Sequence, residues 1–238
     1  MKMVKSCLTL ILALIVCTGI RAQTADEIVN KYFEATGGKE KIGQLKSIHT
    51  ENTVEVMGNQ GPSSITILDK KGFRLDTEIN GQKIVQVLTD KGGWAVNPMM
   101  GSTTPQAIPE DTYKQTRDQI DLAGPLYDYA AKGNKIELVG KEAGAYKLKV
   151  TSADSVETNF FIDSATYRLA KLTRSATVMG QPMEVSSTFS DYKKTDFGIY
   201  VPFTVEISYG GQFSLTTKVN KIEINQEVDP KIFEMPKS

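Results

Sequence analysis

Apolar and polar residues alternate with a period of two along most of this chain, and this pattern limits the folds that it can adopt. The clearest example is Val201, Phe203, Val205, Ile207 and Tyr209, which are separated by polar residues or proline. Successive side chains of a β-strand point to opposite faces of the sheet, so the pattern predicts strands with one apolar and one polar face.

About eleven segments of this kind follow one another between residues 47 and 224, separated by turn residues. The sequence shows no strand–helix–strand pattern, internal repeat or linker, which favours an antiparallel sheet in a single domain. An antiparallel sheet of this width must curl. We therefore predict a mainly β (α+β) fold in which the apolar face wraps around a second layer, its own helices or a ligand.

Two helical segments accompany the strands. Residues 24–27 form a capping box at the start of the first helix, and Gly37-Gly38 ends it. The second segment, residues 109–133, begins with proline and acidic residues, carries a thin apolar stripe and is interrupted at Gly124-Pro125. Residues 98–108, which precede it, are predicted to form a loop.

Trp94, the only tryptophan, lies in a predicted hairpin. Asp90–Gly93 is a turn sequence, Trp94 and Val96 should point to one face of the following strand, and Pro98 should end that strand. Trp94 is therefore either a core residue or the floor of an apolar site. The preceding strand, residues 84–88, has apolar residues on both of its faces, which predicts that both faces are covered.

Two features are predicted near the C-terminus. The apolar phase shifts between Val219 and Ile222, which indicates a β-bulge. The segment Asp229–Phe233 has the pattern of a short turn that tucks Phe233 inward.

The N-terminal residues have the pattern of a secretory signal peptide. Lys2 and Lys5 precede a short apolar run that ends near Ala22, so we expect residues 1–22 to be removed and 23–238 to form one domain. Both cysteines, Cys7 and Cys17, fall in the removed segment, so no disulfide or thiol chemistry is expected. The remaining net charge of −3 gives no reason to expect nucleic acid, and we expect no transmembrane segment in this mature chain.

The sequence offers little for catalysis or metal binding. The only histidine, His49, shares the polar face of its strand with Glu51 and Glu55, which is either a His–Glu–Glu metal site or a solvated strand face. The acidic residues between 110 and 121 fit a solvated helix as well as a carboxylate pair. We predict no catalytic residue, no cofactor and no metal site.

The methionines flank predicted turns. Met57 precedes Gly58, Met99 and Met100 follow Pro98, Met179 precedes Gly180, and Met183 follows Pro182. Methionine is the adaptable apolar residue of promiscuous binding surfaces. These residues form either a soft apolar mouth, if the turns meet at one rim of the sheet, or scattered gap-filling side chains.

Several motifs, in this order, resemble the LolA/LolB-like outer-membrane lipoprotein-sorting (lipoprotein carrier) superfamily of the Gram-negative envelope. They are the helix of residues 25–38, the following hairpins, the Asp90…Gly93-Trp94-Ala95-Val96-Asn97-Pro98 stretch and the ending Val228–Pro236. The segment Gly37–Lys41, Gly-Gly-Lys-Glu-Lys, is similar to that of exported LolA-like sorting proteins.

The resemblance implies a periplasmic protein with a curved, half-open antiparallel barrel whose concave apolar face is covered by helices. It implies binding of the acyl chains of lipids or lipoproteins, with residues 109–131 as a lid. The ligand-binding residues expected on this basis are Trp94, Val96, Ile28, Tyr32, Phe33, Met99, Met100, Ile120, Leu126, Phe203 and Phe213.

One position departs from the family pattern. Where directional carriers have an arginine and a proline that latch the lid, this chain has Lys70-Lys71-Gly72. Lysine cannot make the same bidentate contacts. Two alternatives remain open beside the carrier: an envelope module that binds a partner peptide or protein, and a carboxylate-dependent hydrolase.

Overall fold

The computed structural model describes residues 23–178 and 181–236. The expected signal peptide, with both cysteines, lies outside the described residues. The N-terminal helix α1 (Ala25–Thr36) begins with the expected capping box, in which Thr24 accepts from the backbone N–H of Glu27 and the Glu27 side chain returns the interaction. A short helix, α2 (Lys39–Gly43), follows the Gly37-Gly38 stop.

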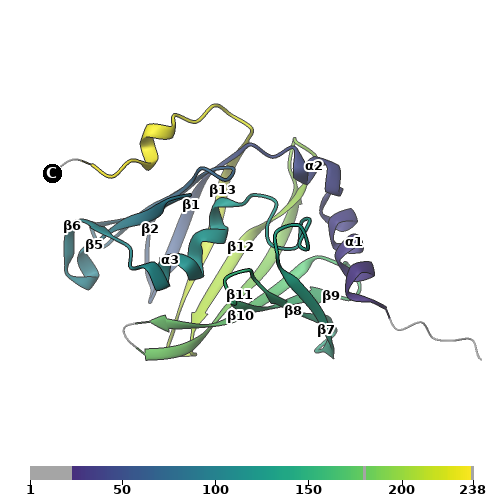
Figure 1. Cartoon of the computed structure of the whole chain (residues 1–238). Coiled ribbons are helices and arrows are strands. Elements are labelled where there is room, and N and C mark those ends of the chain that lie inside the picture. The colour runs from purple at the N-terminus through teal and green to yellow at the C-terminus, as the bar shows by residue number, and fades with distance from the viewer. Residues whose placement is uncertain (1–22, 179–180, 237–238) are drawn as a thin grey trace, which may run out of the picture.

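Thirteen antiparallel strands form one sheet with the order β6-β5-β4-β3-β2-β1-β13-β12-β11-β10-β9-β8-β7. The sheet curls without closing, so β6 and β7 remain as its two edges (Figure 1). This confirms the predicted curved, half-open barrel. The strands are β1 (Ser47–Val56), β2 (Asn59–Leu68), β3 (Gly72–Ile79), β4 (Gln82–Thr89), β5 (Gly92–Asn97), β6 (Ser102–Ala107), β7 (Lys135–Glu142), β8 (Ala145–Thr151), β9 (Glu157–Asp163), β10 (Leu169–Val178), β11 (Gln181–Lys194), β12 (Tyr200–Tyr209) and β13 (Phe213–Ile224).

Two of these strands and one run of turns differ from the sequence prediction. The predicted loop at 98–108 contains the edge strand β6, which has no apolar alternation to mark it. Strand β10 was not predicted, because Arg174 interrupts its apolar face and its register with β9 shifts between Leu169 and Lys171. The predicted helical segment ends early: α3 (Glu110–Thr116) and the 3₁₀ turn η2 (Arg117–Ile120) give way to consecutive turns up to residue 133.

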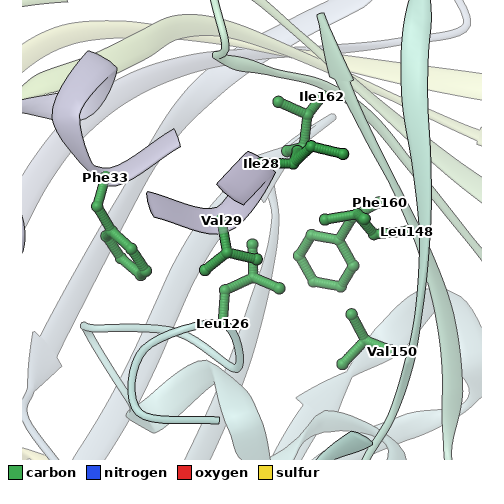
Figure 2. Close-up of a cluster of buried hydrophobic side chains, with 8 residues drawn as sticks. All are labelled: Ile28, Val29, Phe33, Leu126, Leu148, Val150, Phe160 and Ile162. Carbon is green, nitrogen blue, oxygen red and sulfur yellow. The ribbon is translucent and has the colours of Figure 1, made fainter. Parts of the chain in front are cut away.

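One core cluster lies between α1 and the strands β7 to β10 (Figure 2). Ile28, Val29 and Phe33 are 0%, 5% and 3% exposed, and Leu126 closes the cluster from the turns after the lid. Leu148 and Phe160, which are register partners on β8 and β9, face the helix. Burying a side chain of this size contributes about 1.5–3 kcal/mol, so α1 is firmly attached to this half of the sheet.

A second cluster lies on the outer face of β3 to β5. The C-terminal segment crosses this face, and its 3₁₀ turn η3 (Pro230–Phe233) brings Phe233 against Val85, Val87 and Trp94. The lid lies on the other side of the same strands (Figure 1), where Leu88 is fully buried. Both faces of β4 are therefore covered, as its double apolar pattern predicts, and Phe233 is buried as expected.

The register also contains the expected bulge. On β13, Val219 pairs with Asn52 and Lys221 pairs with Glu51, so Asn220 is the extra residue. This shift keeps Ile222 and Ile224 on the same face as Leu215 and Val219, so the apolar residues on both sides of the bulge face the concave side.

Candidate functional site

Apolar side chains from three neighbouring strands lie side by side on the concave face of the sheet. Ile207 on β12 pairs with Leu215 on β13, and Leu215 pairs with Val56 on β1, so these side chains share one face. None of these three is fully buried; each is half-buried. A folded chain is stabilised by covering apolar surface, because each Å² removed from water contributes about 25 cal/mol. The centre of the concave face is therefore the candidate ligand floor.

The lid over this floor is thinly packed. Neither α3 nor η2, both described in full, has a buried residue. A cavity of about 410 Å³ lies between these elements and the strands β8 and β9, with Tyr113, Asp118, Val150 and Phe160 among its lining residues. Cavities that hold small molecules generally fall between about 300 and 1,000 Å³. A lid with few apolar contacts can move away from the floor at little cost.

Polar tethers hold the lid at both ends. On the β3–β4 side, the Lys70 N–H donates to the carbonyl of Ile120 at 2.8 Å, and the Tyr113 hydroxyl donates to the carbonyl of Thr89 at 2.7 Å. On the far side, Arg174 of β10 donates to the carbonyl of Gln115 at 2.7 Å. Because these bonds exchange readily with water, each contributes only about 0.5–1.5 kcal/mol.

Arg174 is a candidate site residue that the sequence reasoning missed. It pairs with Val185 of β11, which places its guanidinium on the apolar concave face. A lone arginine within an otherwise apolar strand pattern was the available signal. The lid is thus bonded by an arginine side chain from the opposite half of the sheet, while Lys70 contributes its backbone N–H.

Ionisable groups around Arg174 have shifted pKa values. Surrounding protein raises the pKa of the Asp118 carboxyl, and the charge of Arg174 opposes that rise. Burial likewise raises the pKa of the Tyr209 phenol, again opposed by Arg174. Asp118 nevertheless stays accessible to solvent at the cavity wall. Arg174, Asp118 and Tyr209 thus form one polar group at the concavity.

A second polar spot lies on the floor itself. Asn52 is 3% exposed and shares the concave face with Ser63, its register partner on β2. Its amide nitrogen donates to Thr50, but its amide oxygen has no hydrogen-bond partner among the described residues. Unsatisfied buried polar atoms are uncommon in folded proteins. The floor could therefore accept a hydrogen bond from a ligand at this point.

The predicted residues of α1 do not lie on the open floor. Ile28, Phe33 and Leu126 are buried in the α1 cluster, where they pack against β8 and β9 (Figure 2). Tyr32 is half-buried beside them, and burial raises its pKa to about 12. These residues form the wall that anchors the helix.

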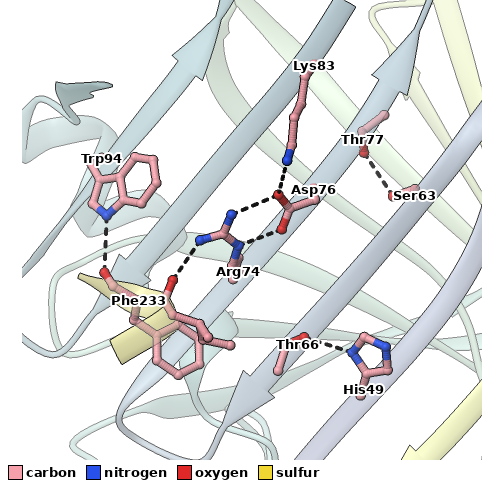
Figure 3. A network of polar contacts seen from close by, with 10 residues as sticks. His49, Ser63, Thr66, Arg74, Asp76, Thr77, Lys83, Trp94 and Phe233 are labelled. Carbon is pink, nitrogen blue, oxygen red and sulfur yellow. Dashed lines mark hydrogen bonds and ion pairs between the residues drawn. The ribbon is translucent and has the colours of Figure 1, made fainter. Parts of the chain in front are cut away.

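Trp94 and Val96 lie on the face opposite the lid. Trp94 is 6% exposed, and its indole N–H donates to the carbonyl of Phe233 at 3.1 Å (Figure 3). Arg74 lies on the same face, donating to the carbonyl of Ile232 at 2.7 Å and pairing with Asp76. The structure therefore separates Trp94 and Val96 from the concave face, because alternation shows which residues share a face but not which face is concave.

The remaining predicted residues border the concavity. Phe203 and Phe213 are half-buried on its strands, and Ile120 is half-buried in the lid. Met99 and Met100, in the 3₁₀ turn η1 (Pro98–Met100), are 61% and 65% exposed at the edge of the sheet. Ligand contact at any of these residues remains a prediction.

The polar face of β1 has no metal-like arrangement. The His49 ring hydrogen-bonds the Thr66 hydroxyl at 2.8 Å, across the strand pair (Figure 3). Among residues 23–178 and 181–236, no group of three His, Cys, Asp or Glu residues converges on a point that could hold a metal ion. No helix in the same described ranges is long and apolar enough to cross a membrane.

No protein-family model and no curated protein matches the sequence. Solved structures do match the fold. A LolA superfamily protein from Nitrosomonas europaea aligns over 90% of this chain and 98% of its own, with 13% identity and a TM-score of 0.56. A protein domain described as outer membrane lipoprotein-sorting, from Vibrio parahaemolyticus, aligns over 87% and 94% with 12% identity and a TM-score of 0.54.

A DUF1329 family protein from Desulfovibrio piger also aligns over 90% of this chain and 98% of its own, with 11% identity and a TM-score of 0.56. Identities this low establish a shared fold. The chain has the fold of the LolA superfamily, as the sequence resemblance predicts.

Proposed function

We propose that this protein is a periplasmic carrier or binding protein for lipoproteins or other acylated, apolar ligands. The ligand's acyl chain would lie on the concave face, between the strands of the sheet and the lid. No covalent step is part of this function.

The observation that carries the proposal is the half-buried apolar floor beneath α3 and η2, the two lid elements that contain no buried residue. An acyl chain laid on this floor would gain about 0.8 kcal/mol for each methylene removed from water. The tethers of the lid, such as the bond from Arg174 to Gln115, are few and polar, so a ligand can replace the lid without disrupting a core. The second core cluster lies outside the exchanged region, on the outer face of the sheet, whereas Val150 and Phe160 of the first cluster also line the cavity beneath the lid.

The export signal expected at residues 1–22 and the shared fold support the proposed location. Both are consistent with a protein that moves hydrophobic cargo through an aqueous compartment. The cargo itself would be defined by an acyl chain and by a polar group that reaches Asn52 or Arg174.

Native mass spectrometry of protein purified from its own envelope tests the proposal. We expect the protein to retain one or more lipids or lipopeptides, which disappear after delipidation and return on adding an acylated peptide. Protein that carries no lipid and takes up none after delipidation would contradict the proposal. The same acylated peptide without its acyl chain is the control, and we expect it not to bind.

A further inference from the structure

The turns at one end of the sheet form a distinct rim. The register places turns 57–58, 80–81, 98–101 and 210–212 at the same end, because Val56 pairs with both Asn59 and Leu215 and because each of the other turns closes its hairpin in that direction. In Figure 1 these turns lie along the lower edge of the sheet. They connect β1 to β2, β3 to β4, β5 to β6 and β12 to β13.

None of these four turns contains a charged residue. Their sequences are Met-Gly, Asn-Gly, Pro-Met-Met-Gly and Gly-Gly-Gln, in a chain of which 24% is charged. The turns at the opposite end of the same strands, 69–71, 90–91 and 195–199, all contain charged residues. In this part of the sheet one end is therefore uncharged and the other is charged, whereas the β8–β9 turn, which contains Asp154, lies at the same end as the four turns but outside this part.

The uncharged end also exposes apolar side chains. Met57, Met99 and Met100 are 80%, 61% and 65% exposed, and they are three of the five large apolar residues that are exposed in the described part of the chain. We call these three residues and the four turns the methionine rim. The rim continues into the concave face, where the rings of Tyr209 and Phe213 stack next to turn 210–212 with their centroids 4.6 Å apart.

We propose that the methionine rim docks on the surface of a lipid bilayer, with Met57, Met99 and Met100 entering the boundary between headgroups and acyl chains. Entry of the rim desolvates no charge, whereas burying even one unpaired charge is costly. Methionine is flexible and polarisable, which suits a disordered lipid surface. None of the four turns presents a charged group that would fix the orientation of a folded protein partner, so a bilayer is the occupant that this surface fits.

Docking in this orientation places the open end of the concave floor at the lipid surface. The path from bilayer to floor would then run past Tyr209 and Phe213 without crossing the charged end. This consequence rests on the proposed carrier function, whereas docking of the rim itself does not.

Flotation with liposomes of phosphatidylcholine, a zwitterionic lipid, tests the proposal. We expect the purified protein to partition onto the liposomes, and raising the salt concentration should not weaken this binding because no rim charge takes part. Replacing all three rim residues (Met57→Gln, Met99→Gln and Met100→Gln) should weaken partitioning by about ten-fold or more, since glutamine keeps the length but not the apolarity. Because the three side chains are exposed, we expect the triple variant to fold normally, and unchanged thermal unfolding verifies this.

Met235→Gln is the matched control, because Met235 is 46% exposed but lies in the C-terminal segment away from the rim. We expect it to bind liposomes like the unaltered protein. The proposal is overturned if the unaltered protein does not float with the liposomes, if the triple variant binds equally well, or if salt abolishes binding. The proposal is also overturned if the unaltered protein binds no liposomes but forms a dimer that the triple variant cannot form. That result would assign the rim to self-association.

Uptake of a fluorescent fatty acid in buffer without liposomes separates this proposal from the carrier function. The unaltered protein supplies this comparison, because Met99 and Met100, which the triple variant replaces, are also among the residues expected to bind ligand. If the unaltered protein takes up no fatty acid, the carrier function alone is contradicted. If it does not float with the liposomes, docking alone is contradicted.

Discussion

The indole N–H of Trp94 donates a 3.1 Å hydrogen bond to the carbonyl oxygen of Phe233, and this bond joins the centre of the chain to its C-terminal segment. The bond lies on the outer face of the sheet, and the side chains of both residues are buried there. The only tryptophan therefore holds the C-terminal segment in place, and the ligand floor lies on the other side of the same strands.

Trp94→Ala should lower the free energy of unfolding by about 3–5 kcal/mol, because it leaves a cavity under Phe233. The affinity of the folded molecules for an acyl ligand should not change. Trp94→Phe keeps much of the bulk and loses the hydrogen bond, so it should cost less. Denaturant unfolding and ligand titration measure the two quantities. Lost affinity with intact stability would return Trp94 to the ligand site that the sequence resemblance implies.

Gly72 lies directly beneath Phe233. A Cβ atom at Gly72 would lie 2.5 Å from the Phe233 ring, so Gly72→Ala should displace the ring and destabilise the protein by about 1–3 kcal/mol. In the Phe233→Ala background the same substitution should cost almost nothing. A double-mutant cycle by chemical denaturation measures this coupling. Additive effects of the two substitutions would show that the C-terminal segment is not packed here in solution.

Removing the guanidinium of Arg174 should loosen the lid. Arg174→Leu deletes the hydrogen bond to Gln115 and leaves an apolar side chain on the concave face. We expect faster hydrogen exchange of the amides in residues 110–121 and faster uptake of an acyl ligand. Arg174→Lys should restore part of the protection, since lysine can reach the carbonyl with one donor. Unchanged exchange in Arg174→Leu would exclude this residue as a latch.

Acid should release the C-terminal segment through Asp76. Burial alone would raise the pKa of this carboxyl, but hydrogen bonds and charge from Arg74 and Lys83 outweigh it and hold the pKa below the ordinary value of 3.8. The carboxylate therefore stabilises the folded state above pH 3.8, and this contribution is lost as the pH falls through the lowered value.

Protonated Asp76 no longer orients Arg74, which donates to the carbonyl of Ile232. We expect Trp94 fluorescence to change in this acidic range, before the rest of the protein unfolds. Asp76→Asn, which cannot titrate, serves as the control and should show the altered signal already at neutral pH. An identical acid transition in Asp76→Asn would exclude Asp76 as the titrating group.

Local chemistry made much of the fold predictable. The capping box at Thr24, the bulge near Asn220 and the burial of Phe233 each follow from a few neighbouring residues. Strand β6 lacked such a signal because it is an edge strand that buries no apolar face. Strand β10 was obscured because Arg174 occupies a position where the pattern requires an apolar residue.

The candidate site was harder to predict, because it depends on which face of the sheet is concave. Alternation correctly placed Trp94 and Val96 on one face of the sheet. Both faces of β4 are covered, so the apolar pattern could not show which face is the outer core and which is the concave floor. The α1 residues were predicted as site residues, but they are packed in the core. The sequence could not separate the two roles, because apolar residues are expected both where a helix covers a sheet and where a ligand binds.

Two neighbouring positions on β12 allow the most direct test of the concave floor. Ile207 faces the concave side, where it pairs with Leu215, and Ser208 faces the outer side, where it pairs with Ser214. Titration of a fluorescent fatty acid into purified Ile207→Asp and Ser208→Asp compares the same charge on the two faces. We predict that Ile207→Asp takes up little or no probe while Ser208→Asp binds it like the unaltered protein. Equal uptake by the two folded variants would contradict a ligand site on the concave face.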